Sequence, residues 1–330
     1  MTMRDVARLA GVSSAAVSRY LNGGYISKEK AERVRAAIEE TGYTPSSQAR
    51  ALRTGSNRLI GVIVPKINSE SVSRITAGIG QVLRERGYQM LLANTENHAE
   101  RELTYLDLFQ SYPVDGIILV ATVLTDAHRE ALSQVRVPAV LLGQDLPGVS
   151  CVYYDDFDAA RDLARAVAAS HAGEIAYIGV FRDDAAAGAA REDGFAAGLA
   201  DAGRDLPADL RREGTFTVDS GHACARDLLA AHPDLSFIAC ATDTMAAGAL
   251  RALAEARPGI EAARHVSGFG DNELLRAITG GIATVHFSYL TSGIEATAML
   301  LDTIETGRGE ERHLQLGYEL MGPIAPGDLR

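Results

Sequence analysis

Short apolar runs alternate with stretches of helical periodicity over most of the chain, from residue 59 onward. Apolar runs without polar alternation are typical of parallel strands that are buried on both faces. Each run of the first series precedes a stretch with the spacing of an amphipathic helix, which predicts a doubly wound α/β unit. The predicted strands are 59–65, 89–94, 116–121 and 138–143.

A second series of the same kind begins at residue 174. Two α/β units in one chain imply a cleft between them, where a ligand is expected. The predicted strands are 174–180, 214–218, 236–241 and 265–270, with helices near 187–203, 220–231, 243–256 and 271–278 and a last strand at 315–321.

The N-terminal residues carry three short helical patterns instead. Thr2 and Asp5 have the spacing of a capping box, Gly11 can form a turn, and Ser13 can cap a second helix. This predicts a helix-turn-helix, whose second helix would enter the major groove of DNA, although the pattern alone equally permits another small helical module. The apolar faces are Val6, Ala7, Leu9 and Ala10, then Val17 and Leu21, then, after the N-cap Ser27, Ala31, Val34, Ala37 and Ile38.

Residues 44–58 form a connecting segment. Pro45 suits the first turn of a helix capped by Thr44, and Gly55 can end it. A helix of this length is marginal in water on its own, so it should need a partner to be ordered. The alternative is a flexible linker.

Charge divides the chain in the same place. The formal net charge of −11 splits into +5 for residues 1–58 and −16 for the rest, which directs phosphate attraction to the N-terminal part. No apolar run of membrane-spanning length and no export signal is visible, so a cytoplasmic protein is expected. Cys151, Cys224 and Cys240 are far apart and are expected to be reduced thiols.

Three strings in the N-terminal part are specific in order and position: DVARLAGVS from Asp5, VSRYLN from Val17 and TGYTPSSQARAL from Thr41. They resemble the headpiece of the LacI/GalR family of bacterial transcription regulators. The resemblance implies a DNA-binding headpiece at 1–44, a hinge helix at 45–58 that pairs in a dimer, and an effector-binding and dimerisation domain at 59–330. Leu52 then matches the leucine that the family inserts into the minor groove. The predicted DNA contacts are Thr2, Arg4, Ser13, Ser14, Ala15, Ala16, Ser18, Arg19 and Asn22 in the headpiece and Ser46, Ala49, Arg50, Leu52 and Arg53 in the hinge.

The resemblance extends to the larger part and implies a core similar to periplasmic sugar-binding proteins, with chain crossings near 155, 286 and 316. The expected N-subdomain is about 59–155 plus 287–316, and the C-subdomain is about 156–286 plus 317–330. No leucine heptad follows the last predicted strand, so a homodimer on a pseudo-palindromic operator is expected.

Ligands in open α/β sheets bind beyond the carboxyl ends of the strands. Arg191 matches the family arginine that holds the effector, although it could instead pair with Glu192 or Asp193 on a helix surface. Asp243 could serve only as a helix cap. Asp271 comes one residue after the position of the family's sugar-binding aspartate, so its role is left open. The predicted effector contacts are Lys66, Asn68, Ser69, Glu70, Thr122, Gln144, Arg191, Thr242, Asp243, Asp271 and Asn272.

The strings CVYYDD from Cys151 and CATDTMAAGAL from Cys240 resemble the trehalose-type repressors, which favours a disaccharide or its phosphate, with Lys66 near the phosphate. No nucleotide-binding motif, nucleophile–base pair or metal-ligand spacing is present, so neither an enzyme nor a cofactor or metal site is expected. His286 ends a predicted strand at a chain crossing, where it could contact the ligand or bond to backbone, and the backbone bond is the preferred expectation. The hypothesis is therefore a sugar-responsive transcriptional repressor. The alternatives are a sugar-binding module without a DNA-binding role, or a corepressor-dependent regulator or activator of the same family.

Overall fold

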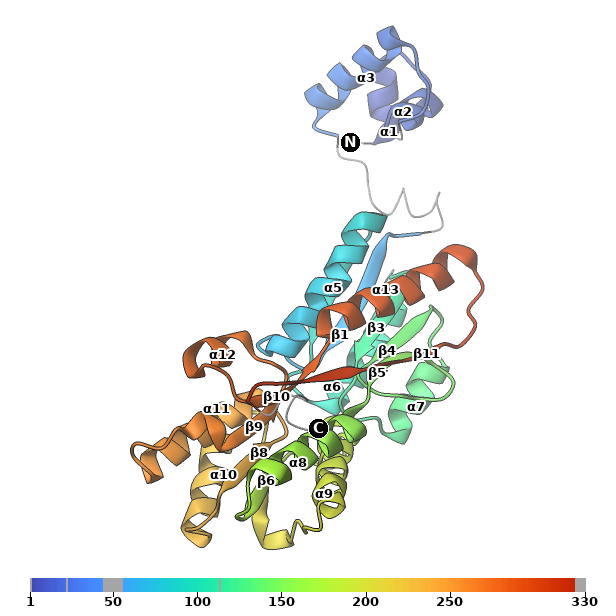
Figure 1. Cartoon of the computed structure of the whole chain (residues 1–330). Helices are drawn as coiled ribbons and strands as arrows, with labels where there is room; N and C mark the ends of the chain where they lie inside the picture. The colour runs from blue at the N-terminus through green and yellow to red at the C-terminus, as the bar shows by residue number, and fades with distance from the viewer. Residues whose placement is uncertain (1, 22, 44–55, 113, 324–330) are drawn as a thin grey trace. The chain divides into compact units, whose positions relative to one another are not determined.

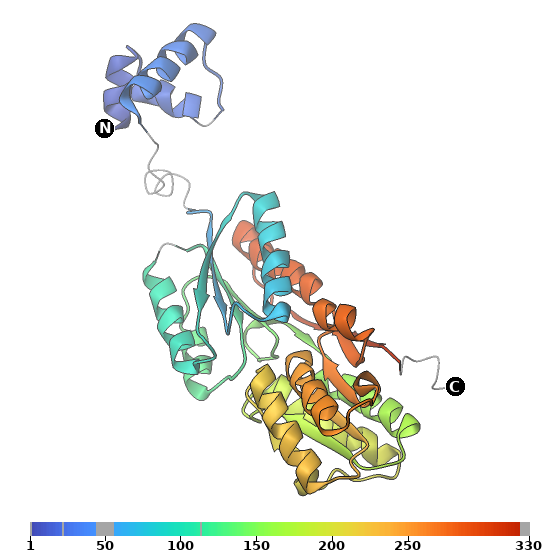
Figure 2. The same cartoon turned by 90° about the vertical axis from the view of Figure 1, so that its left-hand side faces the viewer.

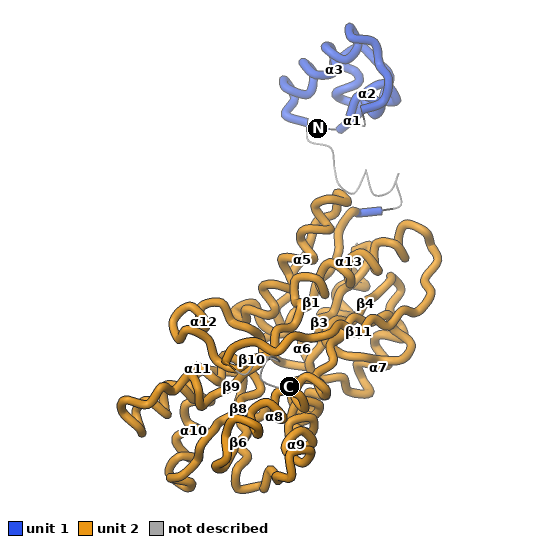
Figure 3. The backbone as a smooth tube through the Cα atoms, viewed as in Figure 1, with its two compact units in different colours: residues 1–57 blue, residues 58–330 orange. Residues whose placement is uncertain are grey.

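The computed structural model describes residues 2–21, 23–43, 56–112 and 114–323, in two compact units of residues 1–57 and 58–330 (Figure 3). The predicted hinge helix and Asn22 lie outside the described residues. Among the described residues, no helix is both long enough and apolar enough to cross a lipid bilayer.

The smaller unit is a three-helix headpiece of α1 (Met3–Leu9), α2 (Ser14–Leu21) and α3 (Lys28–Thr41), which confirms the predicted helix-turn-helix. The capping box between Thr2 and Asp5 is present, and Gly11 makes the turn at a φ of 60°. Val6, Val17 and Val34 are fully buried against one another in the small core. One detail of the prediction was wrong: Leu9 is 48% exposed because it lies beside the buried stripe. Ser27 is the N-cap of α3, as predicted, although its side chain makes no capping hydrogen bond.

The larger unit contains two six-stranded sheets (Figure 1). The first has the order β11-β5-β4-β3-β1-β2, and its strands are parallel. The helices α5 (Glu70–Arg86) and α13 (Tyr289–Thr306) pack on one face, while α6 (Ala99–Ser111) and α7 (Asp126–Ser133) pack on the other. The strands are β1 (Leu59–Val64), β2 (Gln89–Asn94), β3 (Gly116–Val120), β4 (Ala139–Leu142), β5 (Ser150–Tyr154) and β11 (His313–Leu316).

The second sheet has the order β12-β10-β9-β8-β6-β7, with β12 antiparallel to β10 and the other pairs parallel. The helix pair α8 (Asp156–Ser170) and α9 (Arg191–Asp201) and the pair α10 (Val218–Ala231) and α11 (Asp243–Ala256) flank it (Figure 2). The short α12 (Glu273–Thr279) follows β9. The strands are β6 (Ile175–Gly179), β7 (Arg211–Glu213), β8 (Phe237–Cys240), β9 (Val266–Phe269), β10 (Ala283–Phe287) and β12 (Tyr318–Met321).

Within residues 56–112 and 114–323, the chain passes between the two sheets three times: after β5 at Asp155, after β10 at Ser288, and after β11 at Gly317. We call the part built on the first sheet the N-lobe and the part built on the second the C-lobe. Because three separate segments connect the lobes, the cleft between them is bordered by fixed strand ends.

Three of the predicted elements need correction. The strand predicted at 214–218 is instead β7 at Arg211–Glu213, a charged edge strand that has no apolar run to reveal it. The strand predicted at 315–321 is two strands in different sheets, separated at Gly317. Finally, β4 is followed by β5 rather than by a helix, and the sequence pattern did not predict β5 as a strand.

The contact between α5 and α13 depends on two glycines. A Cβ atom on Gly78 would lie 2.2 Å from the carbonyl oxygen of Leu290, and one on Gly293 would lie 2.2 Å from that of Ile75. Such distances are far below van der Waals contact, so the two helix backbones approach as closely as glycine allows.

We predict that Gly78→Ala lowers the free energy of unfolding of the larger unit by about 1–3 kcal/mol, because the added methyl group forces the helices apart. Gly80 is the matched control: it lies on the same helix, and among the described residues no neighbouring atom lies within 4 Å of the place its methyl group would take. Gly80→Ala should therefore raise stability by about 0.5–1 kcal/mol through helix propensity. Urea denaturation of the full chain measures both. Equal effects of the two substitutions would contradict the close approach.

Candidate functional site

A cleft lies between the carboxyl ends of the two sheets in the larger unit, as expected for open α/β sheets. The structure brings all but two of the predicted effector residues to its wall, from both lobes. Those on the wall are Lys66, Ser69, Glu70, Thr122, Gln144, Arg191, Thr242, Asp243 and Asn272.

Arg191 is the buried centre of the C-lobe wall, with an exposed fraction of 6%. Its Nε donates to Asp156 Oδ1 and its Nη1 donates to the carbonyl oxygen of Ala241, each at 2.7 Å. The guanidinium carbon lies 4.8 Å from the ring centre of Phe269 and 5.3 Å from that of Phe287. The side chain is therefore held in one orientation by an ion pair, a carbonyl and two aromatic faces.

Arg191 does not form the surface salt bridge with Glu192 or Asp193 that was its alternative role. Its helix neighbours Glu192 and Asp193 pair with other arginines, Arg211 and Arg182 respectively. Arg191 itself is buried, and its helix is preceded by a π-helical turn at Ala185–Ala190. Such wide turns occur often at functional sites.

Asp184 caps this π-helical turn. Its Oδ1 accepts hydrogen bonds from the backbone N–H groups of Ala186 and Ala187, at 3.1 and 2.9 Å. The same oxygen accepts from Gln144 Nε2 of the N-lobe at 3.0 Å, and Gln144 also donates to the carbonyl oxygen of Thr122 at 2.7 Å. Burial raises the pKa of Asp184 from 3.8 to about 6.

Two further polar contacts join the lobes across the cleft. Lys66 Nζ donates to the carbonyl oxygen of Phe216 at 3.2 Å and lies 5.3 Å from the centre of that ring, while burial lowers the lysine pKa. Glu70 accepts a hydrogen bond from the side-chain amide of Asn272 and pairs with Arg74 on its own helix. We call three hydrogen bonds the cross-cleft contacts: Lys66 to Phe216, Asn272 to Glu70, and Gln144 to Asp184.

Both carboxylate oxygens of Asp243 accept hydrogen bonds from other groups of the protein. One carboxylate oxygen accepts from the Thr284 hydroxyl and the other from the backbone N–H of Asn272, both at 2.7 Å. Burial raises its pKa to about 6. The N-cap is the preceding Thr242, whose hydroxyl accepts from the backbone N–H of Met245. Asp243 lines the cleft and also fixes the loop before α12.

Two predicted effector residues do not line this cleft. Asp271 lines a smaller neighbouring hollow instead, and its carboxylate is held by Arg276 Nη1 at 2.6 Å and His286 Nδ1 at 3.0 Å. The preferred expectation of a backbone hydrogen bond for His286 was wrong for Nδ1, because this nitrogen pairs with the carboxylate of Asp271. Asn68 lies in a neighbouring hollow beside Thr215 and Thr217.

The sequence missed several residues of the cleft wall. Asp156 was not predicted because β5, the strand that precedes it, was not recognised. Asp184 is the N-cap of a turn that begins at Ala185, whereas periodicity placed the start of that helix near residue 187. The aromatic side chains Tyr154, Phe216, Phe269 and Tyr289 also line the cleft, and only their position at or beyond strand ends could have signalled this.

The headpiece presents part of the predicted DNA-contacting set. Arg4, Ser14, Ala15 and Arg19 are exposed and Ser18 is half-buried. Ala16 is 6% exposed, so its methyl group offers almost no surface to DNA, and a side-chain contact is no longer expected there.

Two of the predicted hydroxyls also have structural partners. Thr2 Oγ1 donates to Asp5 Oδ2 at 2.9 Å, and Ser13 Oγ accepts from the backbone N–H of Ala16 at 3.2 Å. The sequence did not single out Arg8, Tyr25 and Lys30, which border a hollow on the headpiece together with Arg19.

Comparisons with known proteins cover nearly the whole chain. The family model "Bacterial regulatory proteins, lacI family" matches residues 2–46, and "Periplasmic binding proteins and sugar binding domain of LacI family" matches residues 28–322. The chain therefore belongs to the LacI family of bacterial regulators. It carries both the DNA-binding and the sugar-binding part of that family, and its relatives are regulators rather than enzymes.

Among its relatives are the sucrose operon repressor of Staphylococcus xylosus, 29% identical over 93% of this chain and 95% of that protein, and the HTH-type transcriptional regulator TreR of Salmonella typhimurium, 28% identical over 95% and 96%. Similar solved structures include the lac repressor dimer bound to operator and the anti-inducer ONPF, with a TM-score of 0.85, 25% identity and 98% of each chain covered. The complex of the regulator CelR with cellobiose has a TM-score of 0.73, 28% identity and the same coverage.

The raised pKa of Asp184 predicts a pH dependence. The folded state retains the Asp184 proton up to about pH 6, whereas the unfolded state loses it near 3.8, so this group makes the protein less stable as the pH rises through that window. Asp184→Asn keeps an oxygen for the three hydrogen bonds. We predict that, relative to wild type, the variant gains about 1–3 kcal/mol of unfolding free energy between pH 4 and pH 7.

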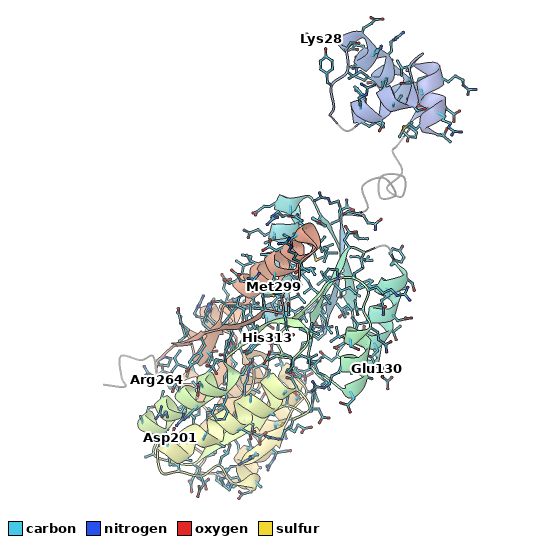
Figure 4. The ribbon with its side chains drawn as sticks, turned by 90° about the vertical axis from the view of Figure 1, so that its right-hand side faces the viewer. Lys28, Glu130, Asp201, Arg264, Met299 and His313 are labelled. Carbon is cyan, nitrogen blue, oxygen red and sulfur yellow. The ribbon has the colours of Figure 1, made fainter. Side chains whose placement is uncertain are left out.

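Asp201 serves as a control of opposite sign (Figure 4), because its hydrogen bond from Arg161 lowers its pKa. Asp201→Asn should lose stability relative to wild type as the pH rises through the acid range. Chemical denaturation across the pH range measures both variants. A parallel response of Asp184→Asn and wild type would rule out the buried-carboxyl account.

Proposed function

We propose that this protein is a homodimeric, cytoplasmic repressor of carbohydrate-utilisation genes that a neutral saccharide releases from its operator. The observation that carries the proposal is the cleft: a clamped arginine, aromatic rings and hydrogen-bonding groups from both lobes face one space, in a chain that begins with a helix-turn-helix. The saccharide is the small molecule the site requires, and the proposed mechanism uses no cofactor. The names of the sucrose operon repressor and the ribose operon repressor among its relatives support a sugar as effector.

The charges around the cleft favour a neutral sugar over a sugar phosphate. Among the residues that the structure describes, the cations on its wall are Arg191 and Lys66, and both are already engaged, Arg191 by Asp156 and Lys66 by a carbonyl oxygen. The carboxyl groups of Asp184 and Asp243 have raised pKa values because they are buried, and a phosphate nearby would meet their negative charge in a poorly solvated place. Carboxylate and amide oxygens suit the hydroxyl donors of a neutral sugar instead.

Specific side chains would divide the work of binding. The guanidinium of Arg191 would donate to neighbouring sugar hydroxyls, since its planar fork is held rigid by Asp156 and the rings. The rings of Phe216 and Tyr289 would cover the apolar faces of the sugar. Gln144 and Asn272 could exchange their cross-cleft contacts for bonds to hydroxyls.

Such an exchange links the sugar to the DNA. A ligand shifts the equilibrium between two lobe arrangements only if it binds one of them more tightly. A sugar that replaces the cross-cleft contacts would favour the arrangement in which those contacts are broken. The segment after the headpiece is predicted to be a marginally stable helix, so a small displacement at its base can decide whether it forms. We propose that the sugar-bound arrangement lowers operator affinity.

A thermal-shift panel of free and phosphorylated mono- and disaccharides tests the effector class, because a ligand that binds the native state raises the melting temperature. The largest shift from a neutral saccharide is the expected result. For that sugar, Arg191→Lys should weaken binding about 10–100-fold by calorimetry, since an ammonium cannot reproduce the fork.

Arg182→Lys, a change at an exposed ion pair of the same lobe, is the matched control and should leave the affinity intact. The largest shift from a sugar phosphate would overturn the neutral effector. Undiminished affinity in Arg191→Lys would remove this residue from the site.

Leu52 lies outside the described residues, and the resemblance assigns it to the minor groove. We predict that Leu52→Ala weakens operator binding about tenfold or more, because the wedge that bends the duplex is lost, while calorimetric sugar affinity stays as in wild type. Gel-shift titration measures the operator affinity. Unchanged affinity would refute the wedge role while leaving the sugar site untouched.

A further inference from the structure

A thiol and an imidazole face each other at the open edge of the N-lobe sheet, although they are far apart in the sequence. Strand β11 pairs in parallel with β5, and the register places His313 opposite Cys151. Residues at opposite positions of neighbouring strands direct their side chains to the same face. The loop after β4 adds Asp145, whose Oδ1 lies 2.5 Å from His313 Nδ1.

The ligand atoms of Asp145, Cys151 and His313 all lie within 4.8 Å of one another. Glu311 holds the imidazole from its other ring nitrogen, since Glu311 Oε1 lies 2.7 Å from His313 Nε2 and accepts from the backbone N–H of Gly148 at 2.7 Å. Figure 4 labels His313 at this edge. Thiolate, imidazole and carboxylate are the ligands of zinc in proteins, and three of them with one water molecule complete a tetrahedral site, while a carboxylate on the second ring nitrogen orients the imidazole.

The sulfur itself is arranged unlike that of an ordinary core cysteine. Cys151 is fully buried, yet its sulfur accepts a hydrogen bond from the backbone N–H of Leu146 at 3.3 Å. Its S–H lies 3.0 Å from the carbonyl oxygen of Val149. A backbone N–H directed at sulfur is the kind of outer contact that tunes metal-bound thiolates, and here the loop that supplies it also supplies Asp145.

We propose that Asp145, Cys151 and Nδ1 of His313 form a binding site for a thiophilic divalent cation, with Zn²⁺ as the best match, while Glu311 orients the imidazole from Nε2. Coordination would release the thiol proton and any proton on Nδ1 to solvent and replace the direct Asp145–His313 contact with bonds to the metal, while the Nε2–H hydrogen bond to Glu311 remains. Local spacing does not reveal the site because two ligands lie at 145 and 151 and the third at 313.

A cation here would join the edge strand to the loop between β4 and β5. Strand β11 continues through Gly317 into β12 of the other sheet, so the cation would anchor one of the three segments that connect the lobes. Because it binds the native arrangement of strands, it should raise the melting temperature of the protein.

Titration of the reduced full-length protein with Co²⁺ tests the site directly, because a cobalt–thiolate bond gives a near-ultraviolet charge-transfer band and tetrahedral Co²⁺ gives visible bands. We expect both, saturating at one Co²⁺ per chain and displaced by Zn²⁺. Cys151→Ser should abolish the charge-transfer band, and His313→Gln should weaken Co²⁺ binding by about 100-fold. Cys224→Ser, which removes a half-buried thiol of the C-lobe, is the matched control and should keep the band.

Absence of the charge-transfer band in the wild-type protein would overturn the proposal, as would its persistence in Cys151→Ser. Calorimetric Zn²⁺ binding without a thiolate band in the Co²⁺ form would mean that surface carboxylates alone bind the ion, which also contradicts it. Circular dichroism checks the fold of each variant. If Cys151→Ser does not fold, His313→Gln at the half-exposed edge decides, and unchanged Co²⁺ affinity there would refute the site.

Discussion

A guanidinium that stays charged at every physiological pH is buried in the C-lobe of this protein, and the cleft is built around it. Burying such a cation is costly unless hydrogen-bond acceptors surround it. Asp156 from the start of α8, a carbonyl after β8, and the rings of Phe269 and Phe287 from β9 and β10 meet this need. The C-lobe strands therefore converge at their carboxyl ends on Arg191.

The N-lobe faces this fixed wall through polar contacts that a sugar can replace. Gln144, Lys66 and Glu70 each follow an N-lobe strand, and each bonds to the C-lobe. The N-lobe contacts are made by side chains of loops and helix starts, whereas Arg191 is held by an ion pair, a carbonyl oxygen and two aromatic rings. This arrangement would suit a regulator in which the C-lobe holds the ligand and the N-lobe responds to it.

Periodicity was enough to place most strands and helices, since buried parallel strands leave continuous apolar runs and α11 was predicted to the residue. Periodicity did not predict β7, whose Arg-Arg-Glu sequence suits an exposed edge. It also did not predict β5, and for that reason Asp156, which follows β5, was not predicted as a residue of the cleft. Strand ends predicted most of the cleft wall, but not the direction of a side chain. Asp271 has a φ of 47° and turns to Arg276, which no spacing rule could foresee. The register between β5 and β11 is likewise a long-range property that only the fold reveals.

The central claim is that sugar in the cleft and operator at the headpiece affect each other's binding. Fluorescence anisotropy of a labelled palindromic operator, titrated with the protein at increasing concentrations of the best-binding sugar, tests it most directly. The account predicts that operator affinity falls with sugar concentration, with a midpoint near the sugar's dissociation constant, and that operator weakens sugar binding by the same factor. Operator affinity that does not change with saturating sugar would contradict it.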